Sequence, residues 1–207
     1  MAAGDPGTGV TAKRIVGVLL AAGRAKRFGS DKLLAALPRA TAHAQAGTGV
    51  AVASCIAMRA ALPETIVIVR PECTELAHAL QGAGARVVEC STADSGMSAT
   101  LACAIAATPD AEGWVIGLAD MPWIAAVTVA RVAGALDDGA LLAAPFLATV
   151  RGHPVGFCND LRAELLALRG DHGAREIIRA HGQRMVRVPV GDAGILRDVD
   201  TPADLAD

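Results

Sequence analysis

The sequence predicts a three-layer α/β/α sandwich built around a mostly parallel sheet. Two observations lead to this prediction. Short apolar runs alternate with amphipathic stretches along nearly the whole chain, which is the order of strands and helices in α/β proteins. The runs are continuously apolar instead of alternating between apolar and polar residues, as expected of strands that are covered by helices on both faces.

The expected strands are the continuous runs of valine, isoleucine and leucine. In chain order they are RIVGVLLA (14–21), TIVIVR (65–70), ARVVEC (85–90), WVIGLA (114–119), ALLAAPF (140–146) and RMVRVPV (184–190). The amphipathic stretches between them predict helices at approximately 48–61, 73–81, 97–107, 127–137, 160–168 and 173–181. Because strand and helix follow one another in this way, ligands are expected outside the carboxyl ends of the strands.

No internal repeat, charge block or linker divides the chain. Residues 14–207 are therefore expected to form a single domain. Residues 1–13 are rich in glycine, alanine and threonine without periodicity, and they are expected to form a flexible N-terminal tail.

The composition excludes several classes of partner. The net charge is −2 and aromatic residues make up 2% of the chain, so neither a basic surface nor stacking platforms for nucleic acid are expected. No apolar run is long enough to span a membrane. The odd count of 5 cysteines, with no C-x-x-C pair, suits reduced thiols, and we expect a cytoplasmic protein.

A cluster of cations follows the first expected strand, in the stretch VLLAAGRAKRFGSDKLL (18–34). Gly23 and Gly29 allow the backbone to turn tightly and approach a ligand, while Arg27 and Lys32 can reach phosphate oxygens. The spacing differs from that of a Walker A loop. A solvated surface loop is the alternative interpretation. The cations in question are Arg24, Lys26, Arg27 and Lys32.

Three aspartates are candidate metal ligands. Asp120 ends the expected strand WVIGLA, where a carboxylate can hold Mg²⁺ beside a phosphate, although it can also cap the next turn. Residues 201–204 read as an ordinary helix start with a threonine cap and a proline in the first turn. That assignment leaves Asp198 and Asp200 unexplained, and a second metal ligand is expected among them.

Three further segments are candidate anion sites. RGHP (151–154) carries an arginine and a histidine, although a lone histidine is more often structural. GDHGAR (170–175) places two glycines and an arginine at an expected helix start, where Asp171 is alternatively an N-cap. Gly96 to Ser98 offer backbone N–H groups at the start of another expected helix.

These motifs, taken in order, resemble one family. LAAGRAKRFGSDK is similar to the nucleotide-binding signature of the MobA-like nucleotidyltransferases, and ADMP, RGHP, GDHGAR and DVDTPADL (198–205) are similar to its later blocks. The likeness runs from about Arg14 to Leu205. Within the family, the chain most resembles the molybdenum cofactor cytidylyltransferases of the MocA type. The resemblance implies a Rossmann-like fold of the nucleotidyltransferase type.

The resemblance also implies roles for individual residues. Leu20, Ala21, Ala22 and Gly23 would wrap the base and ribose, with Ser98 also on the nucleotide side. Arg27 and Lys32 would bind the triphosphate, and Asp120 would hold Mg²⁺ with Asp200 or Asp198 as second ligand. The acceptor side would be formed by Arg151, His153, Asp171 and Arg175.

The implied reaction is the transfer of CMP from CTP to the terminal phosphate of molybdopterin, with release of pyrophosphate. Ala22, where guanylyl-transferring relatives have a second glycine, suggests CTP over GTP. The alternatives are a GTP-using relative, a transferase for another phosphorylated small molecule, or a non-catalytic carrier of the molybdenum cofactor. A molybdoenzyme or its chaperone is an expected partner. The segment after Lys32 and the stretch Ala99 to Ala102, which lacks an arginine, depart from the family pattern.

Overall fold

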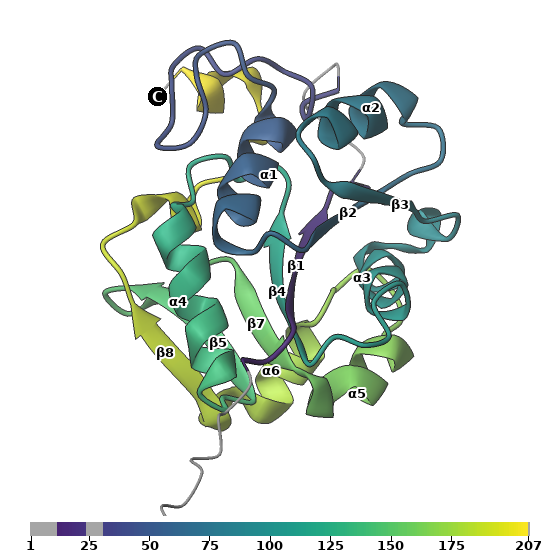
Figure 1. Ribbon diagram of the computed structural model, residues 1–207, viewed down its shortest axis with the longest axis vertical. Coiled ribbons are helices and arrows are strands. Elements are labelled where there is room, and N and C mark those ends of the chain that lie inside the picture. The colour runs from purple at the N-terminus through teal and green to yellow at the C-terminus, as the bar shows by residue number, and fades with distance from the viewer. Residues whose placement is uncertain (1–11, 24–30, 207) are drawn as a thin grey trace, which may run out of the picture.

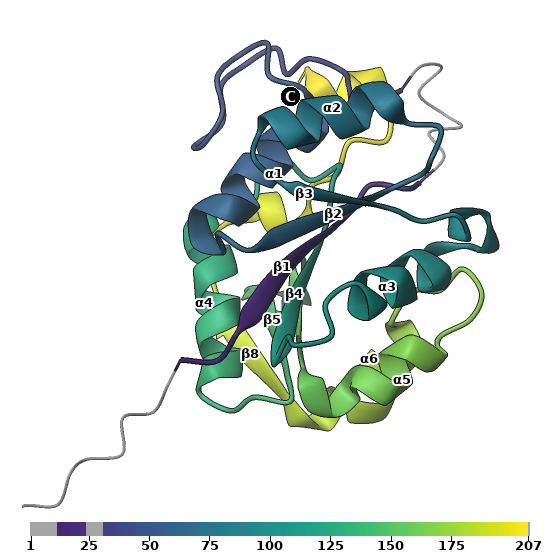
Figure 2. The same cartoon turned by 45° about the vertical axis from the view of Figure 1, so that its right-hand side comes forward.

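A computed structural model of the chain describes residues 12–23 and 31–206. Over this part of the chain the predicted three-layer α/β/α sandwich is confirmed: a mixed, mostly parallel sheet lies between two layers of helices (Figures 1 and 2). Most of the expected N-terminal tail lies outside the described residues. So do Arg24, Lys26 and Arg27, for which the expectations of the sequence stay untested.

The described strands form an eight-stranded sheet in the order β3-β2-β1-β4-β7-β5-β6, with β8 paired to β5. Each predicted strand is present. The strands are β1 (Ile15–Leu20), β2 (Thr65–Val69), β3 (Arg86–Glu89), β4 (Gly113–Leu118), β5 (Leu142–Leu147), β6 (Val150–Arg151), β7 (Val155–Cys158) and β8 (Met185–Pro189).

The strands β1 to β4 are parallel neighbours, and β8 is parallel to β5. The sequence did not predict β6 and β7. Strand β7 is antiparallel to both β4 and β5, and β6 is antiparallel to β5. Both are short, and β7 reads VGFC, which lacks the long apolar run by which the other strands were recognised.

Helices cover both faces of the sheet (Figures 1 and 2). One layer holds α1, α2 and α4, and the other holds α3, α5 and α6. Among the described residues, no helix is long and apolar enough to cross a membrane. The helices are α1 (Val50–Ala61), α2 (Thr74–Gly82), α3 (Met97–Ala106), α4 (Ala126–Asp137), α5 (Arg162–Ala167) and α6 (Arg175–His181).

Each face of the sheet carries its own apolar core, which explains the continuous apolar runs of the sequence. Val16 and Val18 of β1 pack with Leu101 of α3, whereas Leu19 packs on the other face with Met58 of α1. Successive side chains of a strand point to opposite faces, so a strand between two helical layers must be apolar at every position.

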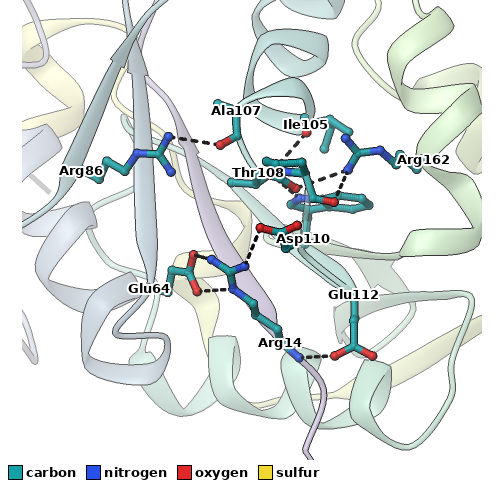
Figure 3. Close-up of polar contacts among 11 residues, drawn as sticks. Arg14, Glu64, Arg86, Ile105, Ala107, Thr108, Asp110, Glu112 and Arg162 are labelled. Carbon is teal, nitrogen blue, oxygen red and sulfur yellow. Dashed lines mark hydrogen bonds and ion pairs between the residues drawn. The ribbon is translucent and has the colours of Figure 1, made fainter.

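Side chains at the amino edge of the sheet make polar contacts with neighbouring segments (Figure 3). Arg14, just before β1, donates two hydrogen bonds to Glu64, from Nε at 2.9 Å and from Nη2 at 2.6 Å. Arg86 at the start of β3 donates to the carbonyl of Ala107. Exposed ion pairs of this kind contribute little to stability. At the opposite edge, where the parallel strands have their carboxyl ends, the surface forms a cleft.

Candidate functional site

A cleft of about 790 Å³ lies at the carboxyl ends of β1, β2 and β4. Its position is the one expected of a ligand site in a sheet of this topology. The cleft brings together most of the predicted nucleotide and catalytic residues that the structure describes. These are Leu20, Ala21, Ala22, Gly23, Lys32 and Asp120, with Asp171 from the predicted acceptor side.

Lys32 lies at the centre of a set of oxygen atoms. Its ammonium donates to Oδ2 of Asp120 at 2.8 Å, to the carbonyl of Val199 at 2.7 Å and to Oδ1 of Asp200 at 3.2 Å. The side chain is 13% exposed. Burial lowers the pKa of Lys32, but the hydrogen bonds and charges of the two aspartates outweigh it and raise that pKa above its usual value. Lys32 is therefore a cation at neutral pH.

Lys32 is held in place by the segment that follows it. The carboxylate of Asp31 accepts a hydrogen bond from the N–H of Leu33, and the carbonyl of Leu33 accepts one from Ala51 at the start of α1. A single β-bridge joins Ala36 to Gly49. These contacts fasten the segment after Lys32 to the start of α1.

Asp120, Asp198 and Asp200 form one cluster of carboxylates, whose ligand oxygens all lie within 4.8 Å of one another. Val199 separates two of them and is fully buried, and its N–H donates to the carbonyl of Asp120 at 2.9 Å. Burial, followed by the charges of Asp200 and Asp120, raises the pKa of Asp198. The cluster thus concentrates negative charge that a cation would relieve.

The donor set fits a divalent cation. Oδ1 of Asp120 is buried and has no hydrogen-bond partner among the described residues, although such oxygens are normally satisfied. Three carboxylates offer the hard oxygen ligands that Mg²⁺ and Mn²⁺ prefer. The alternative in which Asp120 caps the next turn gains no support, because its other oxygen, Oδ2, accepts from Lys32.

The segment that carries Asp198 and Asp200 is tied to the loop after β4. The carboxylate of Asp192 accepts from the N–H of Ala125 at 2.9 Å and from the hydroxyl of Thr128 at 2.7 Å. The guanidinium of Arg197 lies 3.6 Å from the ring centre of Trp123. These anchors could not be predicted from the sequence, because nothing in the local pattern indicates a partner so far along the chain.

The predicted helix start at 201–204 is confirmed as a short 3-10 helix (Pro202–Leu205) with a capping box. The carboxylate of Asp204 accepts from the N–H of Thr201 at 2.6 Å and from the N–H of Asp200 at 3.0 Å. Asp204 thus orients the backbone of Asp200.

Ser98 lies outside the cleft lining. Its side chain is fully buried, its hydroxyl donates to the carbonyl of Gly173 at 3.3 Å, and its N–H donates to the carbonyl of Gly170 at 3.2 Å. The N–H of Met97 is similarly taken by Oδ1 of Asp171 at 3.0 Å. The N–H groups of Met97 and Ser98 were expected to bind an anion. They instead bind the loop at 170–173 to the start of α3.

The remaining acceptor-side residues lie near one another. The pKa of Arg151 is lowered by burial and by the charge of Arg175, which begins α6. The pKa of His153 is lowered by burial and then by the charge of Arg151, so this histidine is neutral at pH 7. Nδ1 of His153 is buried without a hydrogen-bond partner in the described part of the chain. The two arginines are thus close enough for their charges to interact.

Comparison with protein families gives one match: the model of the MobA-like NTP transferase domain aligns with residues 17–185. The chain belongs to the MobA-like NTP transferase family. Among proteins with curated descriptions, no significant match was found. Family membership supports an enzyme of the nucleotidyltransferase class, and it confirms the coarser part of the resemblance seen in the sequence.

Solved structures agree with the family. Rv0371c from Mycobacterium tuberculosis H37Rv is 29% identical, with 95% of this chain and 97% of that chain covered and a TM-score of 0.76. Its homologue from Mycobacterium sp. strain JC1 is 30% identical, with 93% and 96% covered and a TM-score of 0.76. A structure of Rv0371c in complex with manganese is 27% identical, with 93% and 96% covered and a TM-score of 0.70. A divalent metal on such a relative is consistent with the carboxylate cluster.

A substitution at Gly194 tests whether the segment that carries Asp198 and Asp200 must pack closely against the loop after β4. A Cβ atom at this position would lie 2.2 Å from the carbonyl oxygen of Trp123, so Gly194→Ala must displace backbone. We expect a loss of unfolding free energy of roughly 1–3 kcal/mol, measured by denaturant titration, together with reduced nucleotidyl transfer. Gly191→Ala is the matched control, since a Cβ there meets nothing within 4 Å. Equal stability of the two variants would contradict this account of the docking.

Proposed function

We propose that the protein is a molybdenum cofactor cytidylyltransferase, which transfers CMP from CTP to the terminal phosphate of a molybdopterin-type cofactor and releases pyrophosphate. The observation that carries the proposal is the meeting of Lys32, Asp120 and residues 21–23 in one cleft, with the carboxylates of Asp198 and Asp200 within 4.8 Å of Asp120. Membership of the MobA-like family supports the class of reaction. Ala22, in place of a second glycine, supports CTP as the nucleotide.

The chemistry asks the protein mainly for positioning and charge stabilisation. The attacking group is a phosphate monoester, which is already an anion near neutral pH, so the proposed reaction needs no general base. Two polyanions must approach each other, and further negative charge develops on the leaving pyrophosphate. Lys32 is proposed to place a fixed positive charge beside the phosphates, held there by Asp120 and Asp200.

Asp120, with Asp198 and Asp200, is proposed to hold Mg²⁺. When bound, this cation would neutralise charge on the triphosphate and on the leaving pyrophosphate. The protein's own part is to keep the carboxylates close together. The buried Val199 anchors the short segment that carries two of them, while the carboxylate of Asp204 accepts a hydrogen bond from the N–H of Asp200.

The acceptor is proposed to bind beside Arg151 and Arg175. Burial and then the charge of Arg175 lower the pKa of Arg151, and an anion such as the terminal phosphate of the acceptor would relieve such a pair of like charges. Asp171 lines the cleft, and the neutral His153 lies close enough to Arg151 and Asp120 for both charges to act on it. The expected setting is the cytoplasm, where a molybdoenzyme or its chaperone would receive the product.

The test is pyrophosphate release with Mg²⁺ and purified molybdopterin, measured separately with CTP, GTP, ATP and UTP. We expect release with CTP and little with the others. Release with GTP alone would keep the reaction class but overturn the nucleotide assignment. If molybdopterin binds and no nucleotide releases pyrophosphate, transfer is refuted and a carrier role takes its place.

A further inference from the structure

Arg70 is an almost buried arginine on the wall of the cleft. It immediately follows β2, it is 8% exposed, and it lines the cleft together with Ala22 and Asp94. None of the motifs in the sequence points to it. A buried guanidinium is costly unless it is paired and hydrogen-bonded, so its partners indicate what it does.

The guanidinium of Arg70 contacts two other segments that line the cleft. Its Nε donates to the carbonyl of Ala22 at 2.7 Å. Its Nη1 pairs with Asp94, in the 3-10 turn Ala93–Ser95, and lies 3.6 Å from Glu72. The planar fork of an arginine is suited to such a bridge, because it presents several donors in fixed directions. The hydrogen bond that Arg70 donates to Asp94 is also the main reason that the pKa of Arg70 is raised, so its charge is retained.

The bond to Ala22 begins where the sheet ends. The pairing of β1 with β2 ends at Leu20 and Ile68, and the N–H of Ala21 donates to the carbonyl of Ile68 at 2.9 Å. One residue further, at Ala22, the backbone no longer pairs with β2, and its carbonyl accepts a hydrogen bond from the side chain of Arg70 instead. This part of the chain is the start of the predicted nucleotide-binding loop.

The order of the strands places Arg70 on the side of this loop away from the carboxylates. Strand β1 lies between β2, which leads to Arg70, and β4, which leads to Asp120. Phosphates beside Lys32 and Asp120 would direct the nucleoside of a bound triphosphate across the end of β1 toward β2. Arg70 thus braces the part of the cleft that the nucleoside would occupy.

We propose that Arg70 is a positioning residue for the nucleoside half of the triphosphate. By bonding the carbonyl of Ala22 and pairing with Asp94, it holds two walls of the cleft at the spacing that the base and ribose require. This inference rests on the proposed function, because it assumes that a nucleoside triphosphate binds here. It assigns Arg70 no contact with the reacting phosphorus.

The experiment compares two ligands that share phosphates and differ in the nucleoside. CTP and inorganic tripolyphosphate are titrated by calorimetry with Mg²⁺ into the wild type, Arg70→Met and the control Arg86→Met. Arg86 also donates to a backbone carbonyl, but at the amino edge of the sheet (Figure 3). For Arg70→Met we expect CTP to bind about tenfold more weakly and tripolyphosphate within about twofold of wild type, as for loss of one charged hydrogen bond. The control should change neither.

A second variant, Arg70→Lys, separates the bridge from the charge. Lysine keeps the positive charge but cannot span both partners as a planar fork, so weakened CTP binding is expected again. Full rescue by lysine would overturn the proposal. Unchanged CTP binding in Arg70→Met, or an equal loss for CTP and tripolyphosphate, would also overturn it.

The same titrations distinguish this inference from the proposed reaction. If the wild type binds CTP but releases no pyrophosphate, the transfer reaction is refuted, while the selective effect of Arg70→Met on CTP still supports a positioning role. If the wild type binds tripolyphosphate and CTP equally, the nucleoside makes no use of the cleft, and the role of Arg70 is refuted whatever the turnover.

Discussion

Lys32→Ala is expected to lower turnover at least ~100-fold, the scale of losing one electrostatic contact to the transition state. The cause is the removal of the ammonium that lies among Asp120, Asp200 and the carbonyl of Val199. The fold should persist, because the two apolar cores do not include Lys32. The measurement is the rate of pyrophosphate release at saturating CTP and acceptor, with circular dichroism to verify folding.

Lys13→Ala is the matched control for this variant. Lys13 lies just before β1, and its ammonium donates to the carbonyl of Leu136, far from the carboxyl edge. A further readout follows from the charges: without Lys32, three carboxylates face one another, so Lys32→Ala should be less stable than wild type in a chelator and should recover with Mg²⁺. Near-normal turnover would remove Lys32 from the proposed chemistry.

Asp120→Asn is expected to reduce turnover by a similar factor, about 100-fold or more, because the amide is nearly isosteric but carries no charge for a cation or for Lys32. The affinity for Mn²⁺, measured by calorimetry in the absence of nucleotide, should fall with it. Asp110→Asn, at the exposed amino edge, is the control and should leave both quantities unchanged. Normal metal affinity in Asp120→Asn would place the cation elsewhere.

The sequence was sufficient to predict the architecture, because the sheet is covered on both faces. That arrangement requires uninterrupted apolar strands, and each such run became a strand. Strands β6 and β7 were not predicted, because neither contains a long apolar run. Strand β7 is a short strand that lies between β4 and β5. Its pairing with both neighbours depends on the tertiary structure and not on its own composition.

The candidate site was predictable where chemistry follows directly from a strand end. Lys32 and Asp120 could be named as candidates from their places after expected strands, while the role of Leu20 to Gly23 came from the resemblance to the MobA-like family. Arg70 also follows a strand, but a single arginine there gives no signal until its partners Ala22 and Asp94 are known. Contacts between segments distant in sequence carry this information.

Ser98 shows where a local pattern is insufficient to predict a binding role. Residues 96–98 start a helix, and helix starts offer N–H groups to anions, so a ligand role was a reasonable expectation. In the structure the N–H groups of Met97 and Ser98 donate hydrogen bonds to the loop at 170–173. A local pattern can show that donors exist, but only the packing of distant segments shows which acceptor they meet.

A small apolar cluster, separate from the two cores that flank the sheet, surrounds Val199. It consists of Leu37, Ala44, Val50, Ala53 and Val199. This cluster joins the loop that carries Lys32 to the segment that carries Asp198 and Asp200, so the ammonium and two of the carboxylates share a scaffold of their own. Because Val50 and Ala53 belong to α1, the first turn of that helix is part of this scaffold. Changes within the cluster are therefore expected to shift the ammonium relative to the carboxylates while both cores beside the sheet are kept.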